Sequence, residues 1–118
     1  KKKDRTIDLK LAPGGIVDGE FIAQYYSLVE RLREPSTLKV YETLSQKHPI
    51  LKRAYENYTF LRLVETKLRL SKERGSSELS PHELAKISLS LGMEKEELEE
   101  ELRSRMKELR EVFLEVFS

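Results

Sequence analysis

The stretch from Asp8 to Phe21 reads D-L-K-L-A-P-G-G-I-V-D-G-E-F and decides how the rest of the chain is organised. Apolar and polar residues alternate from Ile7 onward, which is the period of a strand with one buried face. Pro13–Gly15 interrupts this strand, because proline lacks an N–H donor and two glycines tolerate positive φ and the close approach of another group. We therefore predict a short strand, a glycine turn and a helix that begins at Ile16.

The glycine turn has two interpretations. A strand, a turn and a helix start direct several N–H groups and the positive helix end at one place, where a phosphate would be stabilised. Lys10 would add a positive charge there, and Asp18 and Glu20 could cap the first helical turn or hold a metal-bound phosphate. In the simpler interpretation Gly14 and Gly15 only form a turn, and the two carboxylates favour the helix N-terminus.

Residues 1–12 as a whole are predicted to be an extended lead-in, in which the strand follows a polar start. A single strand leaves its backbone N–H and C=O groups unpaired, and no second strand is evident in the sequence. We expect its pairing partner to lie outside this chain. Here the strand would be unpaired or would pair with a small isolated element.

The composition limits the classes of protein to which the chain can belong. Its 118 residues suffice for one domain with a single core. Lysine and arginine number 22 against 21 acidic residues, a balance that argues against a nucleic-acid protein held by bulk electrostatics. The absence of cysteine excludes disulfides and thiolate metal sites and suits a reducing cytoplasm. The sequence has no run of about 18 apolar residues, so we predict no membrane span.

Residues 13–118 are predicted to form an all-α, mostly antiparallel bundle of three long and two short helices, because the connections between them are short. The expected bounds are Ile16–Arg33, a Ser36 cap to Gln46, Ile50–Glu73, a Ser80 cap to Gly92, and Glu94–Ser118. The polar residues 74–78 are predicted to be a linker.

Helical spacing assigns each predicted helix a buried face. The core stripe of the first helix is expected to contain Phe21, Ile22, Tyr25, Leu28, Val29 and Leu32. In the second helix Leu38, Tyr41 and Leu44 should point inward and Ser45 outward, and in the fourth Leu84, Ile87, Leu89 and Leu91 should be buried. The apolar seam of the last helix either packs on the first and third helices or forms an oligomer interface.

Local signals mark the start and end of the fourth helix. Ser80 is predicted to be the N-cap, with Pro81 at the first helical position and Glu83 closing a capping box. Gly92 ends the helix near its C′ position. Histidine gives no comparable signal: His48 has no neighbouring His, Cys or paired carboxylate in sequence, so we interpret it as a loop residue and not as a ligand.

Glu65 interrupts the apolar stripe of the third helix. Arg62 lies three positions before it and Arg69 four positions after it, which is the spacing of intrahelical ion pairs. A second interpretation is that Glu65, together with one of these arginines, bridges to the region of Asp18 and Glu20 and fixes the bundle to the glycine turn.

The motifs together resemble a known enzyme family. Residues 8–25, D-L-K-x-x-P-G-G-I-V-D-x-E-F-I-A-Q-Y, are similar to the segment that follows the catalytic fold of glutamine synthetase adenylyltransferase, and are closer to its C-terminal adenylylating half. The segments Tyr58–Leu70 and Leu84–Gly92 resemble two further helices of that family.

The chain departs from the family pattern at Ala12, where glycine is common, and at Gly19, where Ile or Val is usual. We expect Gly19 to leave a hole and a looser helix start.

The resemblance implies a function for the chain. The whole enzyme transfers AMP from Mg–ATP to glutamine synthetase and removes it again, under control of glutamine and the PII signal protein. The family's catalytic Gly-Ser and Asp-x-Asp motifs are absent here, so no catalytic or metal-binding residue is expected and the chain alone should be inert. The expected partners are a preceding nucleotidyltransferase domain, glutamine synthetase and PII. The expected location is the cytoplasm.

In the whole enzyme, this region would form one wall of the nucleotide site. The residues of that wall would be Lys10, Gly14, Gly15, Asp18 and Glu20. The competing hypothesis is a helical interaction or oligomerisation scaffold with no nucleotide role. A standalone enzyme is the weakest option, because the sequence contains no P-loop, no HExxH motif and no nucleophile–base pair.

Overall fold

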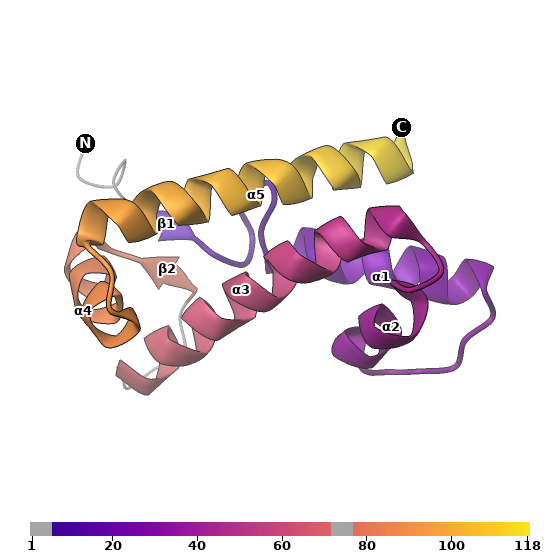
Figure 1. The fold of residues 1–118 in the computed structure, drawn as a ribbon, viewed down its shortest axis with the longest axis horizontal. Helices are drawn as coiled ribbons and strands as arrows, with labels where there is room; N and C mark the ends of the chain where they lie inside the picture. Colours follow the sequence, from indigo (N-terminus) through magenta and orange to yellow (C-terminus); the bar gives the residue numbers. More distant parts are fainter. Residues whose placement is uncertain (1–5, 72–76) are drawn as a thin grey trace.

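The computed structural model describes residues 6–71 and 77–118. That part of the chain forms five helices and two very short strands (Figure 1). In chain order they are β1 (Ile7–Asp8), α1 (Ile16–Val29), α2 (Thr37–Leu44), α3 (Pro49–Ser71), β2 (Glu78–Leu79), α4 (Pro81–Leu91) and α5 (Lys95–Phe117). The predicted all-α architecture is confirmed. Within the described ranges, no helix combines the length and the apolar character that a membrane crossing requires.

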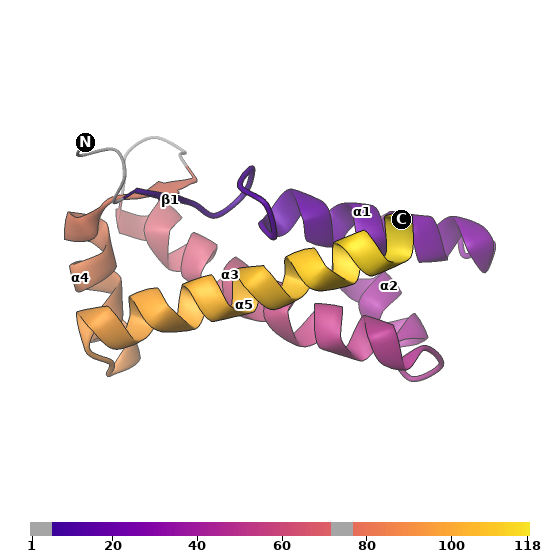
Figure 2. The same ribbon diagram turned by 90° about the horizontal axis from the view of Figure 1, so that it is seen from above.

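Helix α5 lies along the length of the molecule and contacts α1, α3 and α4. Helix α3 runs in the opposite direction and crosses beneath it, while α1 runs alongside α5 in the same direction (Figures 1 and 2). Helix α2 packs on α1 and α3 at one end, and α4 packs on α3 and α5 at the other. The seam of α5 is thus used within the chain, which confirms the packing interpretation of this helix.

The predicted strand does have a partner in the chain. β1 pairs antiparallel with β2, with Ile7 opposite Leu79, and the Leu9 N–H donates to the Ser77 carbonyl at 2.9 Å. Ile7 and Leu9 are both buried in the core. The expectation that the pairing partner lies outside the chain is therefore wrong, and the alternative of a small isolated element is confirmed. The strand stops at Asp8, which leaves Leu11 exposed in the turn.

The predicted caps are confirmed. The Ser36 hydroxyl accepts the Lys39 N–H at 3.4 Å at the start of α2. Ser80 and Glu83 form the capping box of α4, and Gly92 ends that helix with φ 71°. Helix α1 ends at Val29 and not at Arg33, and α2 ends at Leu44 and not at Gln46. The predicted end of α3 at Glu73 and the linker residues 74–76 lie outside the described residues, whereas Glu78, predicted to belong to the linker, lies in β2.

The core face of α1 differs from the prediction. Its buried residues are Ile16, Gly19, Ile22 and Ala23, whereas Phe21, Tyr25, Leu28 and Val29 are exposed. Helix α1 is apolar on both sides, so its periodicity cannot choose between them. Small residues decide the choice. The Gly19 carbonyl accepts the Tyr41 hydroxyl at 2.6 Å, and a Cβ on Gly19 would lie 2.5 Å from the Tyr58 ring. No hole exists at Gly19, because Tyr58 fills it.

Two further side chains face the other way from the prediction. Ser45 is buried, not exposed, because the chain continues from α2 through a tight turn into α3. Leu89 is 80% exposed, because only the Leu84 and Ile87 side of α4 faces α3 and α5. A short helix at the end of a bundle has one covered side, and apolar residues beyond that side stay in solvent.

Candidate functional site

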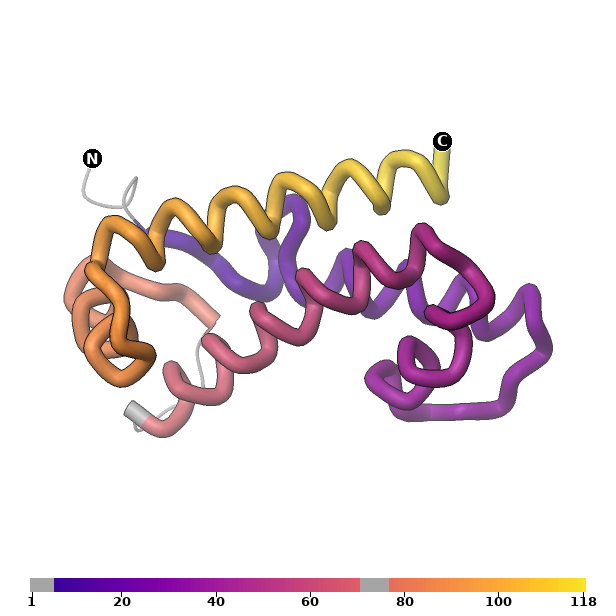
Figure 3. Tube along the Cα trace, viewed as in Figure 1, coloured from indigo at the N-terminus to yellow at the C-terminus, as the bar shows by residue number. Residues whose placement is uncertain are grey.

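The glycine turn lies against the middle of α5, as the chain trace shows (Figure 3). Gly14 has φ 80°, and a Cβ at this position would lie 1.9 Å from the backbone carbonyl oxygen of Met106. Gly14 and Gly15 are both buried. Glycine is therefore required at position 14 for two reasons: the left-handed backbone and the direct approach of another backbone.

The N–H groups at the start of α1 already have acceptors within the chain. Gly15 donates to the Ala12 carbonyl at 2.8 Å, Ile16 to the Leu9 carbonyl at 2.8 Å, and Val17 to the Lys10 carbonyl at 3.1 Å. Gly14 donates to the Asp18 carboxylate at 2.6 Å. These are the donors that the anion interpretation needs. The geometry leaves none of these four for a phosphate and favours the interpretation of a structural turn.

Asp18 joins three segments of the molecule. Its Oδ2 atom accepts the Gly14 N–H and also lies 2.9 Å from Nη1 of Arg110 on α5. The Asp18 side chain is only 13% exposed, so this ion pair is partly shielded from water. The carboxylate therefore holds the turn and α1 against α5. The sequence could not indicate this pair, because the two residues are 92 positions apart.

Lys10, Asp18 and Glu20 do not converge on one surface. Asp18 and Glu20 are two positions apart on a helix, so their side chains point in directions about 160° apart around the helix axis. Asp18 faces α5, whereas Glu20 lines a hollow between α1 and the segment that leads into α2. Lys10 is exposed in the turn before α1. Of the five residues predicted to lie beside phosphate, Lys10 is the one cation, and its side chain is exposed.

Asp8 is a residue of the corner that the sequence analysis missed. Its Oδ1 atom accepts the N–H groups of Lys10 and Leu11, both at 3.0 Å, and the Ser77 hydroxyl at 2.7 Å. Burial by itself would raise the pKa of the Asp8 carboxyl, but these hydrogen bonds favour the ionised form, and the pKa lies below its usual value. In turns, an aspartate side chain often accepts a hydrogen bond from the backbone N–H two residues later. This pattern could have predicted the contact between Asp8 and the Lys10 N–H.

Glu65 is paired within its own helix. Its carboxylate lies 3.2 Å from Nε of Arg62 and 4.0 Å from Nη1 of Arg69, and the residue is 6% exposed. Arg62 also donates to the Tyr58 hydroxyl at 2.9 Å. Burial lowers the pKa of the Arg62 guanidinium, but the contact with Tyr58 and the charges of Glu65 and Glu20 raise it overall. This arrangement favours the intrahelical interpretation of Glu65.

His48 contacts a carboxylate at the end of α1. Its Nε2 atom lies 2.8 Å from the Glu30 carboxylate, which also binds Lys47 at 2.9 Å. Hydrogen bonds from Lys47 and His48 lower the pKa of Glu30. Among the described residues there is no group of three or more His, Cys, Asp or Glu that could hold a metal ion. His48 thus ties the loop after α2 to α1.

Comparison with known proteins places this chain in a family. The model of the GlnD PII-uridylyltransferase family matches residues 1–117. The chain belongs to the GlnD PII-uridylyltransferase family. It is also similar to two curated proteins, each named bifunctional glutamine synthetase adenylyltransferase/adenylyl-removing enzyme. The protein of Nitrosomonas eutropha is 32% identical over 95 residues, and that of Nitrosomonas europaea 33% over 96 residues.

These matches cover 73% and 72% of the chain but only 10% of each relative, so the chain spans about a tenth of their length. The resemblance to glutamine synthetase adenylyltransferase that the motifs predict is confirmed by these relatives. The search of solved structures gave no significant match.

The described residues of this GlnD-family chain do not fit Mg–ATP by themselves. A metal-bound triphosphate needs a cluster of carboxylates and free donors for its oxygens. The acidic residue best placed near the turn, Asp18, is already bound by Arg110 and Gly14, and the amides at the start of α1 are paired. Any nucleotide role of this region therefore depends on groups supplied by a neighbour.

Proposed function

We propose that this chain is the helical domain of a glutamine synthetase adenylyltransferase, which supports the transfer of AMP and contributes no catalytic group. The observation that carries the proposal is the similarity of most of the chain to two proteins with that name. The proposal extends to removal of AMP by the whole enzyme, to nitrogen regulation through glutamine synthetase and PII, and to a cytoplasmic location. The assignment to the C-terminal adenylylating half stays a prediction.

The geometry of the glycine turn supports a structural role for this chain in the reaction. Gly14 packs on the α5 backbone and Asp18 pairs with Arg110, so the turn before α1 is held rigidly. A nucleotidyltransferase domain that precedes β1 would rest on this fixed corner. In that arrangement carboxylates of the preceding domain would hold Mg²⁺ and, through it, ATP, and Lys10, exposed at the corner, would face the phosphates.

A second candidate function is supported by the family match. The GlnD PII-uridylyltransferase model covers residues 1–117, a longer part of the chain than either adenylyltransferase relative covers. In this alternative the same helical domain supports transfer of UMP from UTP to PII. The fixed corner and the exposed Lys10 would serve either nucleotide, because both present phosphates to the protein.

One assay separates the two candidates. The natural full-length protein is incubated with Mg²⁺, ATP and glutamine synthetase, or with Mg²⁺, UTP and PII, and the intact mass of each target is measured. We expect AMP on glutamine synthetase, no UMP on PII, and no transfer by the 118-residue chain alone. UMP on PII without AMP on glutamine synthetase would establish the second candidate. Transfer to neither target would leave a scaffold function.

The role of Lys10 is tested in the same assay. We expect Lys10→Ala to lower the rate about tenfold at subsaturating ATP, since loss of one charge-assisted hydrogen bond costs about 1.4 kcal/mol. The matched control is Lys39→Ala, which removes an exposed lysine on α2. Equal rates for the two variants would remove Lys10 from the nucleotide site.

A further inference from the structure

Helix α1 carries a second apolar face that the described chain does not cover. Phe21 and Tyr25 are half exposed, and Leu28 is 71% exposed, although the opposite side of the same helix is buried in the core. A helix that is apolar on both sides is normally covered on both. Scattered exposed leucines need no explanation, but these three recur on one face of one helix and form a continuous surface.

This face forms one wall of an apolar groove, and the end of α5 forms the other. The groove has a volume of ≈ 280 Å³ and is lined by Phe21, Gln24, Tyr25, Leu28, Phe113 and Phe117. The rings of Tyr25 and Phe117 meet edge to face with centroids 5.5 Å apart, and the centroids of Phe113 and Phe117 are 4.8 Å apart. Aromatic contacts across the groove hold its walls in place before any partner binds.

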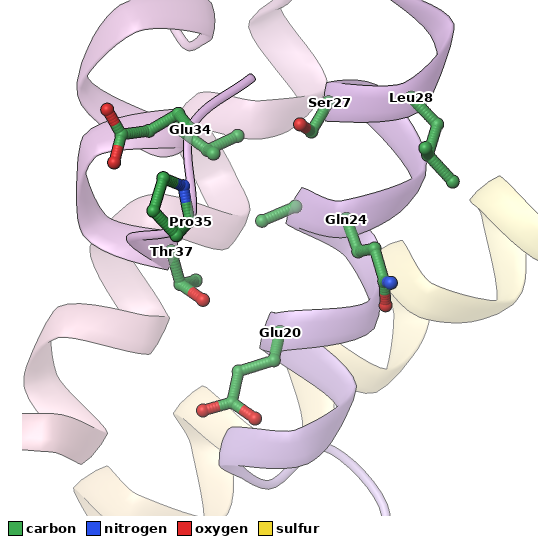
Figure 4. A pocket seen from close by; sticks show the side chains of 9 residues that line it. Glu20, Gln24, Ser27, Leu28, Glu34, Pro35 and Thr37 are labelled. Atoms are coloured by element: carbon green, nitrogen blue, oxygen red, sulfur yellow. The ribbon is translucent and has the colours of Figure 1, made fainter. Parts of the chain in front are cut away.

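An acidic hollow continues from the apolar groove on the other side of α1. It has a volume of ≈ 380 Å³ and shares Gln24 and Leu28 with the groove. The Glu20 carboxylate and the Thr37 hydroxyl project into it, whereas the Glu34 carboxylate turns back toward the chain (Figure 4). Its described lining contains two carboxylates and no Lys or Arg.

The Glu34 carboxylate accepts the Ser36 N–H at 2.9 Å and is partly satisfied. Glu20 has no hydrogen bond or ion pair from the described residues. The charge of Glu20 acts on the Arg62 guanidinium, which is already bound to Glu65 and Tyr58. The hollow therefore attracts a cationic side chain next to an apolar groove.

We propose that this exposed face of α1 docks a basic amphipathic helix supplied by another segment of the same polypeptide. Apolar side chains of that helix fill the groove at Phe21 and Phe117, and a lysine or arginine on its flank reaches Glu20. A segment of the same polypeptide is favoured because the matched stretch makes up only 10% of each relative, so the relatives are much longer than this chain. A tethered helix also binds at high effective concentration. The inference rests on the proposed function in one respect, that this chain is a domain of a longer polypeptide, and does not depend on which nucleotide is transferred.

The test is photo-crosslinking in the natural full-length protein. p-Benzoylphenylalanine replaces Leu28, and the crosslinked peptides are identified by mass spectrometry. The matched control carries the same residue in place of Leu89, which is equally exposed but lies on α4. We expect position 28 to crosslink within one polypeptide, to a segment with helical apolar spacing flanked by Lys or Arg. Crosslinks only to a second copy, only to another protein, only to an acidic segment, or none, would each overturn the proposal.

A second arm tests the charge. In a double variant, Glu20→Gln removes the carboxylate that projects into the hollow, and Glu34→Gln removes the second carboxylate of its lining but keeps an acceptor for the Ser36 N–H. At low salt we expect the crosslink yield from position 28 to fall at least threefold, and the Glu42→Gln control, an exposed carboxylate on α2, to leave it unchanged. Circular dichroism verifies that each variant is folded. An unchanged yield in the double variant would overturn the basic character of the partner.

Discussion

Arg110 on α5 donates to Oδ2 of Asp18 at 2.9 Å, and the same oxygen accepts the Gly14 N–H at 2.6 Å. One atom thus connects the glycine turn, the first helix and the last helix. The contact with Gly14 spans only four positions of the chain, whereas the contact with Arg110 spans 92. The complete corner therefore forms only when α5 is in place. Asp18, for which the sequence predicted either a capping role or a place beside phosphate, thus holds the turn, α1 and α5 together.

Asp18→Ala should destabilise the fold, because it removes one partner from a partly buried ion pair and leaves the Gly14 N–H without its acceptor. We expect the free energy of unfolding to fall by about 2 kcal/mol in urea denaturation. Asp18→Asn keeps an acceptor and should lose about half as much. The control Glu42→Ala, at an exposed position on α2, should stay within about 0.5 kcal/mol of the wild type. Equal stabilities for Asp18→Ala and this control would contradict the role of the carboxylate.

Two glycines with positive φ provide a matched comparison. Gly14 has φ 80° and Gly92 φ 71°, but a Cβ at Gly14 would meet the Met106 carbonyl, whereas nothing lies within 4 Å of a Cβ at Gly92. Gly92→Ala should therefore cost only the left-handed backbone term of about 1 kcal/mol. Gly14→Ala should cost at least about 2 kcal/mol more, because α5 must move away. Thermal unfolding of both variants measures the difference, and similar melting temperatures would show that α5 does not press on the turn.

Acid should weaken the corner through Asp8. The pKa of Asp8 is lower in the folded chain than its ordinary value of 3.8, so folding favours the ionised carboxylate. This contribution to the free energy of unfolding is present above pH 3.8 and is lost as the pH falls through the folded pKa. We expect Asp8→Asn to be less stable than the wild type at pH 7, with the gap closing below about pH 4. Urea denaturation at a series of pH values tests this, and a gap independent of pH would refute it.

Signals that act within one turn of chain could be predicted from the sequence. The box of Ser80 and Glu83 and the left-handed Gly92 depend only on neighbours three or four residues away, so their positions follow from residue types alone. The Pro13–Gly15 turn directly precedes α1 as predicted, although β1 already ends at Asp8 and so before the turn.

Contacts between distant segments could not be predicted in this way. In the strand pair, Ile7 lies opposite Leu79, 72 positions later in the chain. Each strand has only two residues, which is too short a pattern to predict the partner or the register. The side of α1 that enters the core is chosen by the close approach of Tyr41 and Tyr58 to Gly19, and not by the number of apolar residues on each side. For the same reason the candidate site residues could be named but not placed. Asp18 and Glu20 are close in sequence and face different helices.

The variant Glu65→Ala tests whether Glu65 of α3 is needed for the stability of the fold or for nucleotidyl transfer. The carboxylate is buried beside Arg62, and its removal leaves that guanidinium, among the described residues, with the Tyr58 hydroxyl and the charge of Glu20. We expect a loss of about 1–3 kcal/mol in the free energy of unfolding. Arg69→Ala, which removes an exposed partner at 4.0 Å, should cost at most about 0.5 kcal/mol.

Nucleotidyl transfer by the natural full-length protein should survive Glu65→Ala when it is measured well below the melting temperature of the variant. The physical reason is that Asp18 takes its charge partner from α5, so loss of the α3 pair leaves the glycine corner intact. Glu65→Gln, which keeps the side-chain volume and an acceptor, serves as the control for packing. Activity that disappears in both variants at full stability would restore the interpretation in which Glu65 links the bundle to the turn and to Glu20.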